Sequence, residues 1–420
     1  MGFDVVYLPP IHPIGRTHRK GRNNALTAQP GEPGSPWAIG GPEGGHTAVH
    51  PELGTLDDFD RFVAAAASRG LEVALDFAIQ CSPDHPYVRE HPEWFFHRPD
   101  GTIKYAENPP KKYQDVYPLD FSGADPAPLW REMRRIVDFW IGHGVKTFRV
   151  DNPHTKPLSF WEWLIRSVQD AHPEVIFLAE AFTRPKLMKA LAKAGFTQSY
   201  TYFTWRNEKT ELIDYFREIT TPPMADYFRG HLWPNTPDIL HETLQKGGRP
   251  AFIMRMVLAA TLSSLWGMYS GYELCENEPF APGSEEYLNS EKYELKARDF
   301  GAPGNIVDWI TKMNAFRRAH PALQGYDNLT FHRSDDPHVL WYGKMTPSRD
   351  DVVFVGVNLD PFAEHACWVD VPIRELDIPD DRPYAMHELF TDAWYEWRGP
   401  SGYVALAPHR EPAQIFVLHR

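Results

Sequence analysis

Three carboxylates lie at or after strand-like runs, where a parallel α/β fold gathers its polar side chains. Asp151 follows Lys146–Val150, Glu180 follows Val175–Ala179, and Asp238 lies in HLWPNTPDIL. Neighbouring parallel strands lie about 4.8 Å apart, so their last residues can reach the spacing of about 5–5.5 Å that a retaining glycosidic displacement requires. We therefore predict Asp151 as nucleophile, Glu180 as general acid/base and Asp238 as an assisting carboxylate.

Arg149 lies two residues before Asp151, so a strand would place both side chains on one face. Its guanidinium would hold Asp151 ionised by direct charge pairing. The plain alternative is that each carboxylate only ends a strand at the surface, which is the commoner reading for any one of them alone. The three carboxylates in order, with an Arg-x-Asp pair, favour the catalytic interpretation.

The elements that would position these residues alternate between strand and helix in the first two thirds of the chain, which is typical of a parallel α/β fold. We count seven strands, one short of a (β/α)8 TIM-type barrel. The predicted strands are Asp4–Leu8, Glu72–Phe77, Lys146–Val150, Val175–Ala179, Gln198–Thr201, Phe228–Leu232 and Leu265–Tyr269. The predicted helices are Leu56–Arg69, Pro128–His143, Lys186–Ala194, Glu208–Ile219 and Pro250–Ser264.

The pattern changes after about Pro321, where short alternating strands indicate a small antiparallel β-sandwich. We predict a catalytic barrel over residues 1–320 and a C-terminal sandwich over residues 321–420. Two long loop regions, residues 11–52 and 81–125, would build the active-site face of the barrel. The predicted sandwich strands are Val339–Lys344, Val352–Asn358, Ala366–Val371, Tyr384–Leu389 and Ala413–His419.

Length and composition limit the classes of protein to which the chain can belong. Its 420 residues exceed one ordinary domain and fit a large domain with a smaller one. Acidic residues outnumber basic ones, 56 against 43, and the net charge of −13 argues against a nucleic-acid or anionic-membrane partner. Aromatic residues make up 14% of the chain and could equally fill a core or line a sugar-binding groove.

The cysteines Cys81, Cys275 and Cys367 lie far apart without a CxxC pair. This spacing fits a reducing cytoplasm and supports neither a disulfide scaffold nor a zinc site. No apolar run reaches the roughly 18–20 residues of a membrane helix, and the first residues lack the pattern of a signal peptide. We therefore predict a cytoplasmic protein, with no metal and no cofactor implied.

Several segments resemble the α-amylase superfamily, glycoside hydrolase family 13. FRVD resembles its Arg-x-Asp nucleophile motif, FLAE its acid/base strand, and HTAVHPELGTLDDF the segment after its second strand. The finer resemblance is to the α-1,4-glucan:maltose-1-phosphate maltosyltransferases, and it extends over essentially the whole chain. Its segments are LPPIHPIG, RKGRNN, LDFAIQCSPDHP, NPPKKYQD, FRVDNPHTKP, FLAEAFTRP, NTPDIL, SGYELCE and SEKYELKARDF. The resemblance implies a glycosyltransferase that moves maltosyl from maltose-1-phosphate to the non-reducing end of an α-1,4-glucan, with retention and release of phosphate.

Two departures from the general amylase pattern limit what the resemblance implies. Gln80 stands where amylases usually carry a calcium-binding asparagine, which puts a structural calcium in doubt. Thr236-Pro237-Asp238 replaces the usual Asn-His-Asp, so starch hydrolysis is not a safe inheritance. The alternatives are an α-glucan hydrolase or a maltose/trehalose isomerase of the same superfamily, or a non-catalytic glucan-binding fragment.

A phosphorylated donor needs cations and amide donors beside the nucleophile. From the residues alone, the basic loop stretches would be read as solvated, and the resemblance reverses that reading most firmly for Lys20, Lys111 and Tyr113. His154 could line an acceptor subsite or be a structural loop histidine. The resemblance implies as substrate-binding residues Lys20, Gln80, Asn108, Lys111, Tyr113, Arg149, Asn152, His154, Lys292 and Tyr293.

The resemblance begins at the second barrel strand, with GFDVVYLPP from residue 2. The family's first strand, the helix after it and the amino-terminal domains have no counterpart in the chain. We therefore expect a fragment or a mis-started reading frame of a longer protein, poorly soluble or inactive by itself because the barrel would carry unpaired edges. The alternative is a genuine short form that another chain completes. A homodimer is possible for the full-length protein, and the expected partners are maltose-1-phosphate and maltooligosaccharide or α-1,4-glucan acceptors.

Overall fold

The structure is a computed structural model that describes residues 1–108 and 111–420, with the side chains of Asn108 and Lys111 left out. The chain forms two compact units. We name residues 3–199 with 288–297 the N-terminal unit, and residues 1–2, 200–287 and 298–420 the C-terminal unit.

All seven predicted barrel strands are present. The N-terminal unit holds a parallel sheet in which each strand pairs with the next in the order β1, β2, β7, β8, β9. In the C-terminal unit, β10 pairs parallel with β11. The strands are β1 (Val5–Leu8), β2 (Glu72–Phe77), β7 (Thr147–Asp151), β8 (Ile176–Glu180), β9 (Gln198–Tyr200), β10 (Gly230–Leu232) and β11 (Leu265–Trp266).

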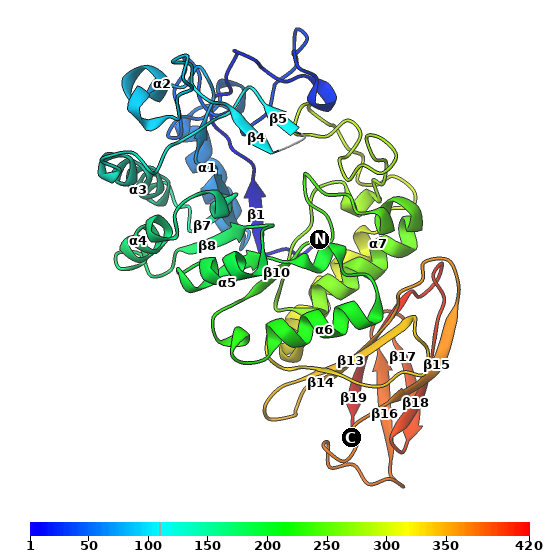
Figure 1. Ribbon diagram of the computed structural model, residues 1–420. Helices are drawn as coiled ribbons and strands as arrows, with labels where there is room; N and C mark the ends of the chain where they lie inside the picture. The colour runs from blue at the N-terminus through cyan, green and yellow to red at the C-terminus, as the bar shows by residue number, and fades with distance from the viewer. Residues whose placement is uncertain (109–110) are drawn as a thin grey trace. The chain divides into compact units, whose positions relative to one another are not determined.

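Helices of the N-terminal unit lie along the same strands, as Figure 1 shows for α1, α3 and α4. Thr55 and Asp58 form a capping box at the start of α1, and Gly70 and Gly144 take the left-handed conformation after α1 and α3. The helices are α1 (Leu56–Ala67), α2 (Pro86–Glu90), α3 (Ala127–Gly142), α4 (Leu158–Gln169) and α5 (Pro185–Lys193).

Helix α4 is absent from the sequence prediction. It begins after Pro157 without a side-chain cap, and aromatic residues such as Phe160 and Trp161, which are weak helix formers, fill its buried face. The apolar residues of this segment are the main indication of a helix in the sequence. In a run of mixed aromatic and aliphatic residues, however, that pattern fits a buried strand as well as a helix. The two predicted long loops contain short pairs: β3 (Gln80–Cys81) with β6 (Tyr117–Pro118), and β4 (Ala106–Asn108) with β5 (Lys111–Tyr113).

In the C-terminal unit, three helices precede the sandwich: α6 (Lys209–Thr220), α7 (Glu242–Leu262) and α8 (Val307–Ala319). Helix α7 is interrupted at Gly248, where φ is 54°, so its second part starts at Pro250 as the sequence predicted. Proline suits a first helical turn, because the amide hydrogen that it lacks would have no partner there.

The antiparallel sandwich is confirmed. One sheet has the strand order β12-β13-β14-β19-β16-β17, and β15 pairs with β18 in a second sheet. The sequence prediction missed β12, β17 and β18. The strands are β12 (Leu329–Phe331), β13 (Val339–Met345), β14 (Val352–Asn358), β15 (His365–Asp370), β16 (Pro383–Glu388), β17 (Ala393–Arg398), β18 (Ser401–Leu406) and β19 (Ala413–His419).

Across the described residues, helix length and hydropathy give no candidate for a membrane span. The division into units does not follow the predicted line between residues 320 and 321. That domain boundary stays a prediction.

Candidate active site

Strand register brings the predicted nucleophile and acid/base together. In the parallel pair of β7 and β8, Asp151 lies directly opposite Glu180. In the pair of β2 and β7, Asp76 lies opposite Arg149. The four side chains therefore meet at the carboxyl ends of three neighbouring strands, and we name them the carboxylate cluster.

Arg149 joins all three carboxyl groups of this cluster. Its Nη1 donates to Asp76 Oδ2 at 2.6 Å and to Asp151 Oδ1 at 2.9 Å, and its Nη2 lies 2.9 Å from Glu180 Oε1. All four residues are buried. Burial lowers the pKa of Arg149, but Asp76, Glu180 and Asp151 outweigh that effect and raise it well above its ordinary value. The guanidinium thus stays charged and compensates carboxylates that burial would otherwise destabilise.

Asp76 is a member that sequence analysis did not single out. Its Oδ2 accepts a second hydrogen bond, from the Tyr7 hydroxyl at 2.6 Å. Burial raises the pKa of Asp76 to about 7, Arg149 opposes the rise, and Asp151 adds to it. Burial thus favours the protonated form of Asp76, while the hydrogen bonds from Arg149 and Tyr7 favour its carboxylate.

Asn152, the residue after Asp151, contacts the carboxylate cluster from the loop that follows β7. Asn152 has φ 43° and precedes a short helix, Pro153–Thr155. Asparagine takes this left-handed conformation at lower cost than most residues. Its backbone N–H donates to Glu180 Oε2 at 3.4 Å, and its Nδ2 donates to Asp151 Oδ2 at 3.5 Å.

His154 and Lys156 follow Asn152 in the same loop. Burial lowers the pKa of His154, with the charge of Lys156 adding to the effect and Asp151 opposing it. His154 Nδ1 is buried and has no hydrogen-bond partner among the described residues. Burial also lowers the pKa of Lys156 to about 8, with Asp151 opposing. Because Nδ1 is buried, its missing partner does not decide between the ligand-facing and the structural reading of His154, and both stay open.

Lys20 is buried, with 2% of its surface exposed. Its Nζ donates to Gln114 Oε1 at 2.7 Å and to the Lys112 carbonyl at 3.5 Å. Burial lowers the pKa of Lys20, and Asp115 opposes the change. Lys20 therefore fastens its own loop to the segment after β5, and a phosphate would compete with Gln114 for this ammonium group.

The other predicted donor-site residues lie on neighbouring short strands. Gln80, on β3, donates from Nε2 to the Trp37 carbonyl at 3.3 Å. Tyr113 ends β5 and is half-buried. Asn108 and Lys111 face each other in the register of β4 and β5, but their side chains are outside the described part of the structure.

Lys292 and Tyr293 belong to the late segment that joins the N-terminal unit. Both are buried, and Lys292 Nζ lies 5.7 Å from the centroid of the Tyr293 ring. The segment is tied to the RKGRNN loop, since Asn289 N–H donates to Asn23 Oδ1 at 2.7 Å and Arg22 pairs with Glu294 at 2.6 Å. Two motifs that the sequence predicted separately are thus neighbours.

Asp238 lies in the C-terminal unit, in the turn that follows β10. Its backbone N–H donates to Thr236 Oγ1 at 3.2 Å, and Thr236 and Ile239 form an isolated bridge. Asn235 nearby is buried and donates to the Tyr287 hydroxyl at 2.8 Å. This network fixes the turn, and the role of Asp238 stays a prediction.

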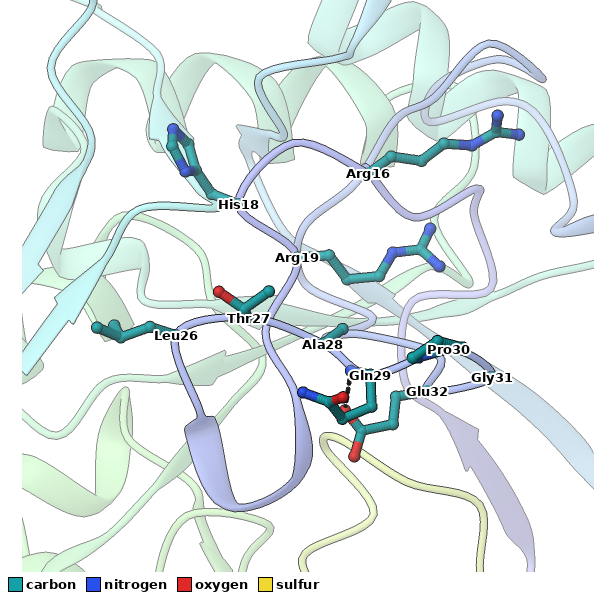
Figure 2. Close-up of a pocket in the computed structure, with 10 residues that line it drawn as sticks. All are labelled: Arg16, His18, Arg19, Leu26, Thr27, Ala28, Gln29, Pro30, Gly31 and Glu32. Carbon is teal, nitrogen blue, oxygen red and sulfur yellow. Dashed lines mark hydrogen bonds between the residues drawn. The ribbon is translucent and has the colours of Figure 1, made fainter.

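A hollow of about 520 Å³ lies on the loop of residues 16–32 (Figure 2). Its lining includes the guanidinium groups of Arg16 and Arg19, the imidazole of His18 and the carboxyl group of Glu32. Arg19 already donates to the carbonyls of Ile14 and Gly15, both at 2.8 Å. No member of the carboxylate cluster lines this hollow.

His46, Cys81 and His85 are buried, and one possible metal-ligand atom of each lies within 4.8 Å of the others. Hydrogen bonds already occupy both ring nitrogens of the histidines. His85 Nδ1 accepts from the Tyr87 N–H, so its Nε2 carries the proton and donates to His46 Nδ1 at 3.1 Å. His46 Nε2 then donates to the Ala78 carbonyl at 3.0 Å. A metal on His85 would break this chain, so the geometry disfavours a metal there.

Sequence reasoning missed Asp76, Tyr7 and Lys156 in this region. Asp76 and Tyr7 lie on strands that were predicted, and alternation could have placed Asp76 on the face of Arg149. Lys156 follows the FRVD motif closely, but only burial reveals that its pKa is lowered.

The chain is similar to curated maltosyltransferases along its whole length. It is 60% identical over 420 residues to the α-1,4-glucan:maltose-1-phosphate maltosyltransferase of Myxococcus xanthus (strain DK1622), covering 100% of this chain and 63% of that protein. Identity to the enzyme of the same name from Mycolicibacterium smegmatis is 57%, covering 99% of this chain and 60% of that protein. The chain thus spans under two thirds of the length of these relatives.

Solved structures show the fold. A maltogenic α-amylase from Thermotoga neapolitana has a TM-score of 0.76 at 19% identity, covering 100% of this chain and 91% of that one. The α-amylase of Geobacillus thermoleovorans, complexed with acarbose, has a TM-score of 0.74 at 16% identity, covering 100% and 89%. Residues 331–418 match the family described as GLGE, C-terminal. Over the segment that it shares with them, the chain is similar to the α-1,4-glucan:maltose-1-phosphate maltosyltransferases.

Proposed function

We propose that the chain carries the catalytic residues of a retaining maltosyltransferase, which moves maltosyl from maltose-1-phosphate to the non-reducing end of an α-1,4-glucan and releases phosphate. The observation that carries the proposal is Asp151 directly opposite Glu180, with Arg149 bonded to both. The names of the relatives support the choice of donor and acceptor.

In the first step, Asp151 attacks C1 of the donor sugar. The C1–O bond to phosphate breaks, phosphate leaves with the bonding electrons, and a β-linked maltosyl ester forms on Asp151. Arg149 donates to Asp151 Oδ1 at 2.9 Å and holds this carboxyl group in position for the attack. Phosphate is a good leaving group, so Glu180 has little protonation to perform in this step.

In the second step, Glu180 acts as the base. It takes the proton from the 4-hydroxyl of the glucan, whose oxygen attacks C1 from the face that phosphate left. The ester bond breaks, Asp151 is regenerated as a carboxylate, and two inversions give an α-1,4 link. Asp238 would accept hydrogen bonds from hydroxyl groups of the sugar ring. These bonds would become stronger as positive charge develops on the ring.

The direct test supplies maltose-1-phosphate with maltohexaose and measures phosphate release and product length. The proposal expects one phosphate per two added glucose units. A superfamily hydrolase would instead yield free maltose, and an isomerase would convert maltose or trehalose without an acceptor.

The roles of the two carboxylates are separable. In Glu180→Ala, a reactive donor such as maltosyl fluoride should load the enzyme, because the first step needs little acid, and deglycosylation should stall. Mass spectrometry should then find the sugar on Asp151. A sugar found on Asp238 would contradict the assignment.

The donor phosphate provides a second test. Replacing Lys111 with Met or Tyr113 with Phe should weaken use of maltose-1-phosphate far more than use of maltosyl fluoride, which has no phosphate to hold. Equal losses with both donors would contradict a phosphate-binding role.

We also propose that the protein works in the cytoplasm and that the longer protein assembles as a homodimer. The three cysteines are free, which suits a reducing compartment. Light scattering on the longer protein would give its mass, and cell fractionation its location.

A further inference from the structure

Two large aromatic side chains lie side by side in solvent on the sandwich. Trp368 on β15 is directly opposite Tyr403 on β18, and their rings pack edge to face with centroids 5.5 Å apart. Their exposed fractions are 57% and 54%. The alternate residues Cys367 and Val404 point inward and belong to the sandwich core. An exposed aromatic pair on the outer face of this sheet marks a place where a ligand gains by covering it.

Polar groups surround this pair on the same outer face. The next outward pair in the register is Asp370 opposite Ser401, and both are exposed. A hollow of about 330 Å³ adjoins them, lined by His332, Asp370, Val371, Pro372, Pro400 and Ser401. On the other side of β15, Arg333 and Asp335 form an exposed ion pair at 2.7 Å.

Residue 334 fixes which way this ion pair points. Ser334 forms a bridge with Val369 and is buried, so its neighbours Arg333 and Asp335 project outward with Trp368. We name Trp368, Tyr403, Asp370 and Ser401 the aromatic platform, with the ion pair as its border.

The platform's chemistry selects the class of ligand. Two carboxylates against one guanidinium make the patch acidic, which disfavours phosphates and nucleic acids. An aromatic face beside hydroxyl, carboxylate and guanidinium groups suits a neutral ligand with apolar faces and many hydroxyls, which is a sugar. The two rings are inclined by 67°. Inclined stacking surfaces fit a chain that curves from one unit to the next, as α-1,4-linked glucose does, better than a flat β-1,4-linked chain.

We infer that the aromatic platform is a second carbohydrate-binding site, which holds a stretch of α-1,4-glucan through Trp368 and Tyr403 and is built from no residue of the carboxylate cluster. Its role would be to retain a polymeric acceptor on the enzyme. The choice of α-1,4-glucan over other neutral glycans rests on the proposed function.

The test compares Trp368→Ala and Tyr403→Ala with Trp394→Ala in the 420-residue chain. Trp394 is a matched control because it is 58% exposed and lies on β17, outside the platform. Affinity for glycogen is measured by retardation in native gels, with circular dichroism to verify folding. Each platform variant should bind glycogen about tenfold more weakly, the loss expected for one stacking ring, and the control should bind like the parent. Ser401→Ala, which removes only a hydroxyl, should give a smaller loss in the same direction.

Turnover separates this inference from the proposed function. Phosphate release with maltotriose, a small acceptor that does not need to be retained as a polymer does, should be unchanged in Trp368→Ala. Unchanged glycogen affinity in Trp368→Ala would overturn the platform, whether or not the enzyme turns over. Weakened glycogen affinity without phosphate release in the parent would uphold the platform and contradict the proposed function. Competition by cellohexaose equal to that by maltohexaose would overturn the assignment to α-1,4-glucan.

Discussion

The N-terminal unit buries two clusters of ionisable groups by opposite means. In the carboxylate cluster, Arg149 supplies a charge that three carboxyl groups share. In the histidine cluster, formed by His12, His46 and His85, no opposite charge is bonded to the rings. Burial lowers the pKa values of these three histidines to about 3, 4 and 2, so all of them stay neutral.

The difference follows from what each cluster has to do if Asp151 is the nucleophile, as we propose. A nucleophile has to be anionic, so its burial requires a cation within hydrogen-bonding distance. The histidines only need partners for their ring nitrogens, and backbone groups provide them: the Ala78 carbonyl, the Tyr87 N–H and, for His12 Nδ1 at 3.1 Å, the Ala48 carbonyl. A buried charge is kept where chemistry uses it, and neutral hydrogen bonds serve where only packing is required.

The largest effect should come from the nucleophile itself. Asp151→Asn should lower the rate of phosphate release by at least about 10⁴-fold, because no other carboxylate can form the ester. Thermal unfolding should change little, since the amide still accepts from Arg149. Steady-state phosphate release measures the loss of rate. A large drop in the melting temperature would contradict the expectation that the fold is unaffected.

The next largest effect should come from the cation of the cluster. Arg149→Met removes the charge at similar volume and should destabilise the fold by about 3–5 kcal/mol, because buried carboxylates lose their compensation. Arg134→Met is the control: Arg134 pairs with Asp138 at 2.7 Å one turn further along α3, where both side chains are only partly buried, and its loss should cost only about 0.5 kcal/mol. Urea unfolding gives both values, and equal losses would contradict the comparison.

The histidine cluster should make the fold sensitive to acid. Its folded pKa values lie below the ordinary value of 6.5, so the unfolded chain takes up protons first as the pH falls. The stability contributed above pH 6.5 should therefore be lost towards pH 4, by up to about 1.4 kcal/mol per pH unit for each histidine. His46→Phe should flatten this slope in urea unfolding measured between pH 4.5 and 6.5.

Asp76 should make the free energy of unfolding fall as the pH rises. This contribution is opposite in sign to that of the histidine cluster and smaller in size. Its folded pKa of about 7 lies above the ordinary value of 3.8, so its stabilising contribution is complete below pH 3.8 and is lost as the pH rises through 7. Removing this group with Asp76→Asn should make the free energy of unfolding rise more steeply with pH than in the parent. If the free energies of unfolding of Asp76→Asn and of the parent changed in parallel with pH, Asp76 would be ionised in the folded protein.

The smallest effect should be that of chelation. Gln80 donates to the Trp37 carbonyl, and the nitrogens of His46 and His85 are bonded to each other and to the backbone. Neither place therefore needs a metal, and EDTA should leave the melting temperature and phosphate release unchanged. A clear fall in the melting temperature would show that one of them holds an ion.

The sequence by itself determined the order of most elements and the positions of the candidate catalytic residues Asp151 and Glu180. Strand-like runs that end in Asp151 and Glu180 predicted both the parallel sheet and the place of its carboxylates, since parallel strands put their carboxyl ends at one edge. The departures from the general amylase pattern at Gln80 and Thr236 were also visible in the sequence. Helix α4 and strands β12, β17 and β18 were not, because their signals are weak without packing.

Only the tertiary structure decided how the charges are shared. The raised pKa of Asp76, the hydrogen bond from Lys20 to Gln114 and the lowered pKa of Lys156 all depend on burial and on partners distant in sequence. The same holds for Trp368 and Tyr403, which are 35 positions apart in the chain and become neighbours only through the register of β15 and β18. Residue types set which interactions are possible, and desolvation and register decide which of them form.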